Sequence, residues 1–297
     1  MDITVLGVGE GGKAIAQTCA ASGCSVRLWA DDATGVMDAV DHIEQQLVNN
    51  SLSEDSGDSI DPKIEGTTGL EAAVAGSDIV IETATNDVGT LQRQFAAIEQ
   101  HVEDDVVMLS SNPDQSITAA SAGMRHPERG LGMQFVTNGP EPLVEVVVTE
   151  HATDQAIATI EQFVETLGAT AIYVRDVPGL ASTRLTLAIE VEAMWLVADG
   201  VASVTAVDTL LKERYNHPRG PLEQADRVGL ETRQAEFEHL VETISDRYEP
   251  PPLLDALVEA GYTGQAAGEG FYSWDGDEPT GEGVEGPNFG EQDEAQK

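Results

Sequence analysis

The first fifteen residues constrain this chain more than any other stretch, because an apolar segment there runs into three closely spaced glycines. Gly7, Gly9 and Gly12 have the G-x-G-x-x-G spacing. In such a turn the first glycine lets the chain leave a strand sharply, the second lets the backbone approach a pyrophosphate, and the third lets helix and strand pack closely. The helix N-terminus then offers free N–H groups and a positive dipole end to an anion. The sequence therefore predicts a strand, a phosphate-binding turn and a helix to about Ser22.

The second apolar segment, residues 25–30, supports a dinucleotide over a purely structural turn. It ends in Asp31 and Asp32, about 20 residues beyond the glycines. An acidic residue at this point accepts hydrogen bonds from an adenosine ribose and repels a 2′-phosphate. The pattern favours NAD over NADP, with Asp31 as the candidate ribose-binding residue.

Apolar segments with strand and helix periodicity alternate as far as Pro178 and Gly179, which predicts a Rossmann-type, doubly wound parallel sheet over residues 1–177. Further strands are expected at 78–82, 106–110, 131–135, 143–148 and 170–174, with helices at 36–50, 91–100 and 154–167, a short helix around 72–74, and a polar loop at 51–61. Residues 178–274 show helical intervals only, which predicts an all-helical second domain. Residues 275–297 are acidic and glycine-rich, and we expect a disordered tail there.

Composition narrows the classes of function. The chain has 53 acidic and 15 basic residues, a net charge of −38, which opposes binding to nucleic acid or to an anionic membrane. A hydrophobic content of 41% argues for a folded protein, so the charge indicates an acidic surface adapted to concentrated salt, as in a halophile.

The absence of a long apolar segment indicates a cytoplasmic protein. No apolar run approaches 18 residues, and the chain begins directly with a core strand, which leaves no room for a signal peptide. Cys19 and Cys24 are expected to be buried free thiols. The spacing of the histidines, cysteines and carboxylates does not suggest a metal site.

Several stretches in order along residues 1–274 resemble the L-3-hydroxyacyl-CoA dehydrogenase family. Besides the glycine turn they are 78–82 (DIVIE), 110–113 (SSNP), 143–147 (LVEVV), 178–179 with 184–185 (PG and RL), 220–230 (GPLEQADRVGL) and 268–272 (GEGFY). The resemblance implies oxidation of the 3-hydroxyl of an acyl-CoA, NAD as cofactor and a homodimer formed through the helical domain. Counted from Gly23, the aspartate of the family falls on Ala30, so Asp31 stands one residue late.

The resemblance also places the site residues, and here the chain departs from the family. In the family's G-[LM]-H-F-F-N-P segment a histidine takes the hydroxyl proton, but the corresponding residue is Gln134. The glutamate that orients the histidine corresponds to Glu145 in the LVEVV stretch. Glutamine donates and accepts hydrogen bonds but does not carry a proton between pH 5 and 8.

Other site positions differ as well. The serine that contacts the substrate hydroxyl in the family's S-N-T-S-S segment corresponds to Asp114 or, with a gap, to Ser116, and the asparagine of P-G-F-x-x-N-R corresponds to Thr183. Asp114 is a candidate replacement base, although an ordinary turn or helix cap explains it equally well. Glu82, at the end of a predicted strand, and Asn112 are candidate cofactor-binding residues.

Two further differences from the family lie between residues 27 and 93. A second glutamate of the family corresponds to Asn86. The segment that receives the CoA nucleotide in the family is poor in cations here, because Lys63 is the only lysine or arginine between Arg27 and Arg93.

Three hypotheses follow. The first is an NAD-dependent 3-hydroxyacyl-CoA dehydrogenase of fatty-acid or hydroxybutyryl-CoA metabolism. The second is an NAD-binding homologue that has lost this catalysis and serves as a binding or regulatory protein. The third is a dehydrogenase of another small hydroxy acid that uses a different base. The sequence alone does not separate them, because loss of a general base lowers the rate by about 10²–10⁴-fold without abolishing it.

Overall fold

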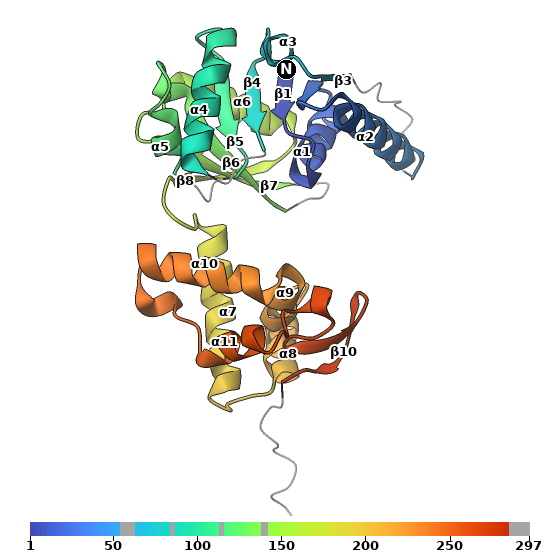
Figure 1. Ribbon diagram of the computed structural model, residues 1–297, viewed down its shortest axis with the longest axis vertical. Coiled ribbons are helices and arrows are strands. Elements are labelled where there is room, and N and C mark those ends of the chain that lie inside the picture. Colours follow the sequence, from blue (N-terminus) through green and yellow to red (C-terminus); the bar gives the residue numbers. More distant parts are fainter. Residues whose placement is uncertain (54–62, 84–86, 113–115, 138–141, 285–297) are drawn as a thin grey trace, which may run out of the picture. The chain divides into compact units, whose positions relative to one another are not determined.

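The computed structural model describes residues 1–53, 63–83, 87–112, 116–137 and 142–284. The chain divides into two compact units, Met1–Ala181 and Ser182–Lys297 (Figure 1). We call them the N-terminal and C-terminal units and describe each by itself.

An eight-stranded sheet forms the centre of the N-terminal unit, with the strand order β3-β2-β1-β4-β5-β6-β7-β8. The strands are β1 (Asp2–Leu6), β2 (Ser25–Trp29), β3 (Ile64–Thr67), β4 (Ile79–Glu82), β5 (Val107–Ser110), β6 (Gly130–Thr137), β7 (Leu143–Val148) and β8 (Thr170–Arg175). The first six are parallel, and the order reverses between β1 and β4, which confirms the doubly wound fold.

The sheet is mainly parallel, as predicted, but its last two strands run in the opposite direction. β7 runs antiparallel to β6, and β8 pairs parallel with β7. Only residues 138–142 separate β6 from β7, whereas a parallel pair requires a crossover of a dozen or more residues. The short connection therefore forces the chain to turn straight back.

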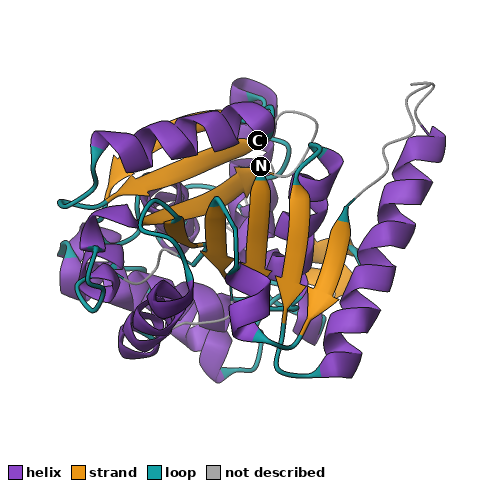
Figure 2. Ribbon diagram, turned by 90° about the horizontal axis from the view of Figure 1, so that it is seen from above, coloured by secondary structure: helices purple, strands orange, loops and turns teal. Residues whose placement is uncertain are grey.

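Helices cover both faces of this sheet (Figure 2). They are α1 (Glu10–Ala21), α2 (Ala33–Ser53), α3 (Leu70–Val74), α4 (Val88–Ile98), α5 (Ile117–Ser121) and α6 (Asp154–Thr166), with 3-10 turns at Glu99–His101 and Pro127–Arg129. One buried cluster joins Ile3 and Val5 of β1 to α1, α2 and α6, and another joins Leu6 to α3, α4 and α5. The alternation along β1 thus supplies a core on each face.

Two short elements and one helix end differ from the expectations. β3 and α5 were not predicted, because each is only four or five residues long and has a weak periodic signal. α2, with 21 residues, runs into the segment expected to be a loop.

Cys19 and Cys24 are buried and free, as predicted. In the ranges that the structure describes, none of the helices is both long and apolar enough to cross a bilayer.

The C-terminal unit is helical, as predicted, but it ends in a hairpin. Its elements are α7 (Ser182–Ala198), α8 (Val204–Tyr215), α9 (Pro221–Val228), α10 (Leu230–Thr243), α11 (Pro252–Glu259), β9 (Tyr272–Asp275) and β10 (Glu278–Glu282), with 3-10 turns at Asp246–Tyr248 and Gln265–Ala267. The expectation of a disordered tail from residue 275 is therefore wrong as far as residue 284. The side chains of β10 are mostly exposed, and it is ordered by backbone pairing with β9, whose Tyr272 and Trp274 are buried.

Candidate active site

The glycine turn has the geometry that a pyrophosphate requires. β1 ends at Leu6, Gly7 has a φ of 122°, and Gly9 precedes α1 as its extended N-cap. A Cβ on Gly12 would overlap the Gly7 carbonyl and lie 2.9 Å from Thr83 Oγ1, so the helix packs against the turn only with glycine there. Gly9, by contrast, has open space where its Cβ would lie. Nothing therefore blocks the backbone at Gly9, directly before the first N–H groups of α1, which is where a phosphate binds in such turns.

Asp31 and Asp32, which follow β2, differ in their hydrogen bonds. Both are exposed, but Asp32 accepts hydrogen bonds from the backbone N–H groups of Thr34 (3.3 Å) and Gly35 (2.7 Å). Asp32 therefore caps the start of α2. Asp31, directly after Ala30, remains the carboxylate that we expect to face a ribose.

A mostly apolar pocket lies beside the glycine turn, and its lining includes Gly7, Trp29, Leu70 and Glu82. Glu82 ends β4 in register with Leu6, is 1% exposed, and accepts a hydrogen bond at its backbone oxygen from Ser111 N (2.8 Å). Trp29 and Leu70 were not among the predicted site residues. The position of Trp29 at the carboxyl end of β2 was the available signal, because ligands of such sheets bind at this edge.

Hydrogen bonds within the protein account for some of the polar residues that follow β5. Asn112 N donates to Ser110 Oγ (3.3 Å), and Asp114 lies outside the described residues. Ser116 caps α5 by accepting from Ala119 N (3.1 Å), and its hydroxyl donates to Asp176 Oδ2 (2.9 Å). A substrate contact by Ser116 would compete with this cap.

Asp176, directly after β8, was not among the predicted site residues. Its carboxylate accepts from the backbone N–H groups of Ile117 (3.2 Å) and Thr118 (2.7 Å), so it ties the segment after β8 to the first turn of α5. We interpret Asp176 as a structural carboxylate of this loop region.

Gln134 and Glu145 come together across β6 and β7. The register places them directly opposite one another, and residues so paired have Cβ atoms about 4.5–5.5 Å apart on the same face of the sheet. Glu145 is 1% exposed, and its Oε1 accepts a hydrogen bond from the backbone N–H of Ala181 (3.0 Å). Gln134 is half-buried. The pair joins a neutral amide that donates and accepts hydrogen bonds to a buried carboxylate that accepts them.

Thr183 lies in the first turn of α7 and is half-buried. It belongs to the C-terminal unit, whereas the other site residues that the structure describes belong to the N-terminal unit. A threonine here offers a hydroxyl donor and acceptor in place of the amide of an asparagine.

The motifs of the C-terminal unit are structural. Asp226 is buried and accepts hydrogen bonds of 2.9 Å from Phe271 N, Tyr272 N and Trp274 Nε1. Burial raises the pKa of Asp226 to about 6 against the opposing effect of these donors. A Cβ on Gly270 would overlap the Asp226 carboxylate. The GEGFY stretch is therefore built around this aspartate.

Asp208 has a similar role at the other end of α9. It is buried and accepts hydrogen bonds of 2.9 Å from Leu222 N and Glu223 N and from the Tyr272 hydroxyl. Desolvation raises the pKa of Asp208. The side chain of Asp208 occupies the space that a Cβ on Gly220 would need, which explains the glycine before Pro221.

Comparison with known proteins agrees with this arrangement. Residues 2–177 match the family described as 3-hydroxyacyl-CoA dehydrogenase, NAD binding domain, and residues 179–274 match its C-terminal domain. The probable 3-hydroxybutyryl-CoA dehydrogenase of Bacillus subtilis is 32% identical over 279 residues, which cover 92% of this chain and 97% of the relative. The 3-hydroxybutyryl-CoA dehydrogenase of Bradyrhizobium diazoefficiens is 31% identical over 285 residues, covering 93% and 96%.

The fold is similar over the same length. The crystal structure of (S)-3-hydroxybutyryl-CoA dehydrogenase from Ralstonia eutropha is 30% identical and has a TM-score of 0.85, with 92% of this chain and 99% of that one covered. The N-terminal unit is thus an NAD-binding domain, and the resemblance inferred from the sequence motifs is confirmed. The chain belongs to the 3-hydroxyacyl-CoA dehydrogenase family.

Proposed function

We propose that this protein is an NAD-dependent oxidoreductase that acts on the 3-hydroxyl of a 3-hydroxyacyl-CoA. The observation that carries the proposal is the glycine turn, whose open face at Gly9 and close packing at Gly12 fit a dinucleotide pyrophosphate. Glu145, at the position of the family's orienting glutamate, supports it. The names of the relatives point to hydroxybutyryl-CoA as the first substrate to test.

In this reaction, bound NAD would supply the acceptor for the hydride that leaves C3. As the carbonyl forms, the proton must leave the hydroxyl oxygen on that carbon, and Gln134 offers the hydroxyl a hydrogen bond but no site for the proton. In the family a histidine accepts this proton, and Glu145, which the strand register pairs with Gln134, is proposed here in the orienting role of the family's glutamate. Asp114 is the candidate acceptor and lies outside the described residues.

The substitution at position 134 favours one alternative, an NAD-binding homologue with little or no catalysis. A missing histidine base costs about 10²–10⁴-fold in rate, which leaves measurable activity if the other contributions remain. Assays of the purified protein with NAD and 3-hydroxybutyryl-CoA in concentrated KCl decide between them. Turnover supports the dehydrogenase, cofactor binding without turnover supports the homologue, and turnover of free hydroxy acids alone supports a different substrate.

We further propose that the protein works as a homodimer in a salt-rich cytoplasm. The net charge of −38 supports the salt-rich environment. Leu185, Val201, Leu210 and Tyr215 of the C-terminal unit are each more than half exposed, which supports association through its helices. Light scattering after gel filtration in molar KCl tests the assembly, and a monomeric mass would contradict it.

A further inference from the structure

Two arginines of the C-terminal unit converge on one tyrosine hydroxyl. Arg184 lies in the first turn of α7, and its Nε is 3.5 Å from Tyr248 Oη. Arg247 belongs to the 3-10 turn that contains Tyr248, and its Nη2 is 3.2 Å from the same oxygen. The Arg247 guanidinium also lies over the Tyr248 ring, with Cζ 4.9 Å from the ring centroid. Two cations therefore share one neutral oxygen as their hydrogen-bond acceptor.

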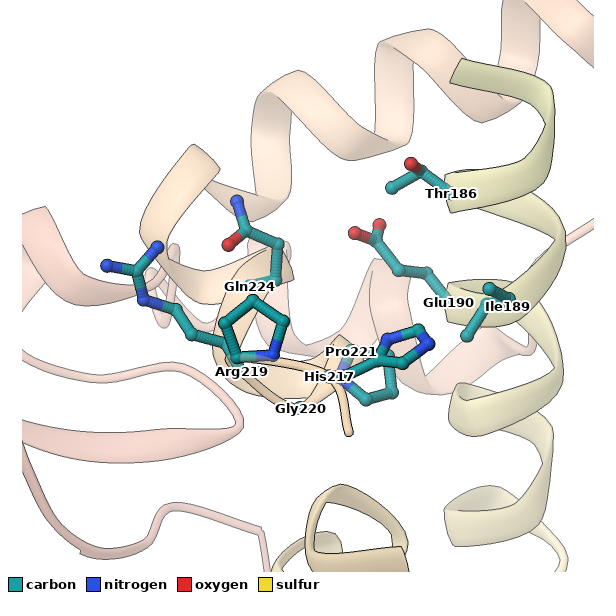
Figure 3. Close-up of a pocket in the computed structure, with 9 residues that line it drawn as sticks. Thr186, Ile189, Glu190, His217, Arg219, Gly220, Pro221 and Gln224 are labelled. Carbon is teal, nitrogen blue, oxygen red and sulfur yellow. The ribbon is translucent and has the colours of Figure 1, made fainter. Parts of the chain in front are cut away.

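Three other arginines of the same unit each lie beside a carboxylate. Arg233 Nη2 is 3.0 Å from Oε1 of the buried Glu190, and Arg227 Nε is 3.1 Å from Glu223 Oε1. Arg219 Nε is 4.0 Å from the same Glu223 oxygen, and Figure 3 shows its guanidinium directed away from Glu190. Carboxylates of the unit thus offset the positive charge at these three positions.

Arg184 and Arg247 differ from these three, because no carboxylate in the described ranges forms an ion pair with either of them. Asp246 and Glu249 adjoin Arg247 and Tyr248 in the chain, but both are exposed and neither forms such a pair in the part of the chain that the structure describes. The chain has 53 acidic residues against 15 basic ones, yet the described residues bring two cations together here without a counter-charge. Like charges held together repel one another, so an anion bound between them would be stabilising.

The Tyr248 hydroxyl supplies a third hydrogen-bond donor. Tyr248 is 3% exposed and packs in the apolar cluster of its own unit, together with Phe237 and Leu254. A phenol oxygen accepts hydrogen bonds and also donates one. Tyr248 Oη accepts from the two arginines, and none of the residues that the structure describes accepts its hydrogen. A buried donor without an acceptor is costly, so this hydrogen is available to a ligand.

The phenol also reports the positive charge around it. Burial alone would raise the pKa of Tyr248, but the hydrogen bonds and the charges of Arg184 and Arg247 outweigh burial and lower it. The surroundings of the hydroxyl therefore favour a negative charge, although the net charge of the chain is −38.

We propose that Arg184, Arg247 and Tyr248 form a binding site for a small oxoanion of the phosphate class. Each guanidinium has five N–H groups and donates one of them to Tyr248, so most of them remain for a ligand. Guanidinium groups bind oxoanions through parallel hydrogen bonds, and a phosphate has enough oxygens for both arginines and for the hydroxyl. All three residues belong to the C-terminal unit, so the inference does not depend on the proposed reaction.

Calorimetric titration of the intact protein with inorganic phosphate in concentrated KCl tests the site. We expect saturable binding of one phosphate per chain. Arg247→Gln, at an exposed position, should leave the fold intact and weaken binding by about tenfold or more, because it removes a charge-assisted donor. Arg214→Gln is the matched control, because Arg214 is also exposed and lies over a tyrosine ring, with Cζ 5.8 Å from the Tyr215 centroid. It removes the same charge and should leave phosphate binding unchanged.

The ionisation of Tyr248 is a second measurement. A bound anion opposes formation of the phenolate, so phosphate should raise the pKa of Tyr248, followed by the ultraviolet absorbance of tyrosinate. Tyr248→Phe removes this transition and thereby identifies it among the five tyrosines. In Arg247→Gln the transition should move to higher pH and no longer respond to phosphate. Arg184→Gln should have the same effect, which keeps the test open if one variant does not fold.

Methyl phosphate in the same titration distinguishes two sources of the anion. Binding of both compounds supports a site that accepts a phosphoryl group carried by a larger molecule. Binding of inorganic phosphate alone supports a site for the free anion.

Three results would overturn the proposal. The first is the absence of saturable phosphate binding to the wild type. The second is an equal loss of phosphate affinity in Arg247→Gln and Arg214→Gln, which would reduce the effect to net charge. The third is a fall in the mass of Arg247→Gln in light scattering, which would show that a carboxylate of a second copy holds the arginines. None of these measurements uses turnover, so they leave the proposed function to its own assay.

Discussion

Gln134 of β6 stands directly opposite Glu145 of β7, on the same face of the sheet. The carboxylate is buried and accepts a hydrogen bond from Ala181 N, so its position is well defined although the residue it faces has no titratable nitrogen. We propose that this arrangement keeps the orienting partner of the family's base and replaces the base itself.

Gln134→His should restore that base. A neutral imidazole held by Glu145 accepts the 3-hydroxyl proton as the hydride leaves, and we expect turnover of 3-hydroxybutyryl-CoA to rise by about 10²–10⁴-fold above the histidine pKa. Adding Glu145→Gln should remove the gain. A wild type that is already fully active, with a slower histidine variant, would show that another residue is the base, Asp114 being the first to test.

Gly9→Ala should separate cofactor binding from folding. A Cβ at Gly9 meets nothing within 4 Å and its φ of −65° suits alanine, so the melting temperature without cofactor should stay close to that of the wild type. The added methyl occupies the space that the pyrophosphate needs, and NAD affinity measured by calorimetry should fall at least about tenfold. Gly11→Ala, also open but not one of the three spaced glycines, is the control. An equal loss of NAD affinity in Gly9→Ala and Gly11→Ala would argue against the assigned role of Gly9.

NAD should bind more tightly than NADP because of Asp31. Its carboxylate repels a 2′-phosphate, so Asp31→Asn should narrow the difference between the two dissociation constants. Asp32→Asn should leave their ratio unchanged, because Asp32 caps α2, and should cost at most about 1 kcal/mol of stability. Indistinguishable affinities of the wild type for both cofactors would refute this assignment.

Stability should increase with salt into the molar range. The carboxylates outnumber the cations 53 to 15, and their repulsion extends over a Debye length that shrinks from about 10 Å at 0.1 M to about 3 Å at 1 M. Thermal melts in KCl check this, with sucrose as an uncharged control for general solvent exclusion. A melting temperature that is flat or falls from 0.1 M upward would count against a halophilic protein.

Glu99 should make the N-terminal unit sensitive to acid. Burial alone would raise its pKa, but Arg125 N at 2.6 Å, the Arg129 guanidinium at 2.9 Å and His126 N at 2.9 Å outweigh burial and hold the pKa below its usual value. The ionised Glu99 carboxylate therefore stabilises the folded state above the unfolded-state pKa of about 4.3. This stabilisation is lost as the pH falls through the lower folded-state pKa.

Glu99→Gln tests this linkage. It should cost roughly 3–5 kcal/mol at neutral pH, because Arg129 is left buried without its partner, and it should flatten the loss of stability in acid. Glu165→Gln, at an exposed site on α6, should retain the wild-type slope in denaturation from pH 7 to pH 3. If the free energy of unfolding of Glu99→Gln falls with pH as steeply as that of the wild type, other carboxylates cause the acid sensitivity.

The sequence by itself determined the parts of this protein that depend on local spacing. The three glycines predict the turn after β1, because each steric demand is met within a few residues of the chain. The alternation of apolar strands and helices predicts the doubly wound sheet, and the motif order is sufficient to identify the family and to locate Glu145 in β7.

Tertiary structure decided what depends on distant partners. The direction of β7 and β8 follows from a short connection, and β10 forms because β9 offers it a backbone edge rather than through any apolar pattern of its own. Asp31 and Asp32 are both aspartates, and only the hydrogen bonds at the start of α2 show that Asp32 is the cap, which leaves Asp31 for the proposed ribose contact. Asp176 holds α5 from 59 residues away, and Arg233 holds Glu190 from 43, contacts that local periodicity does not record. Long-range hydrogen bonds and ion pairs of this kind form only after the chain has folded.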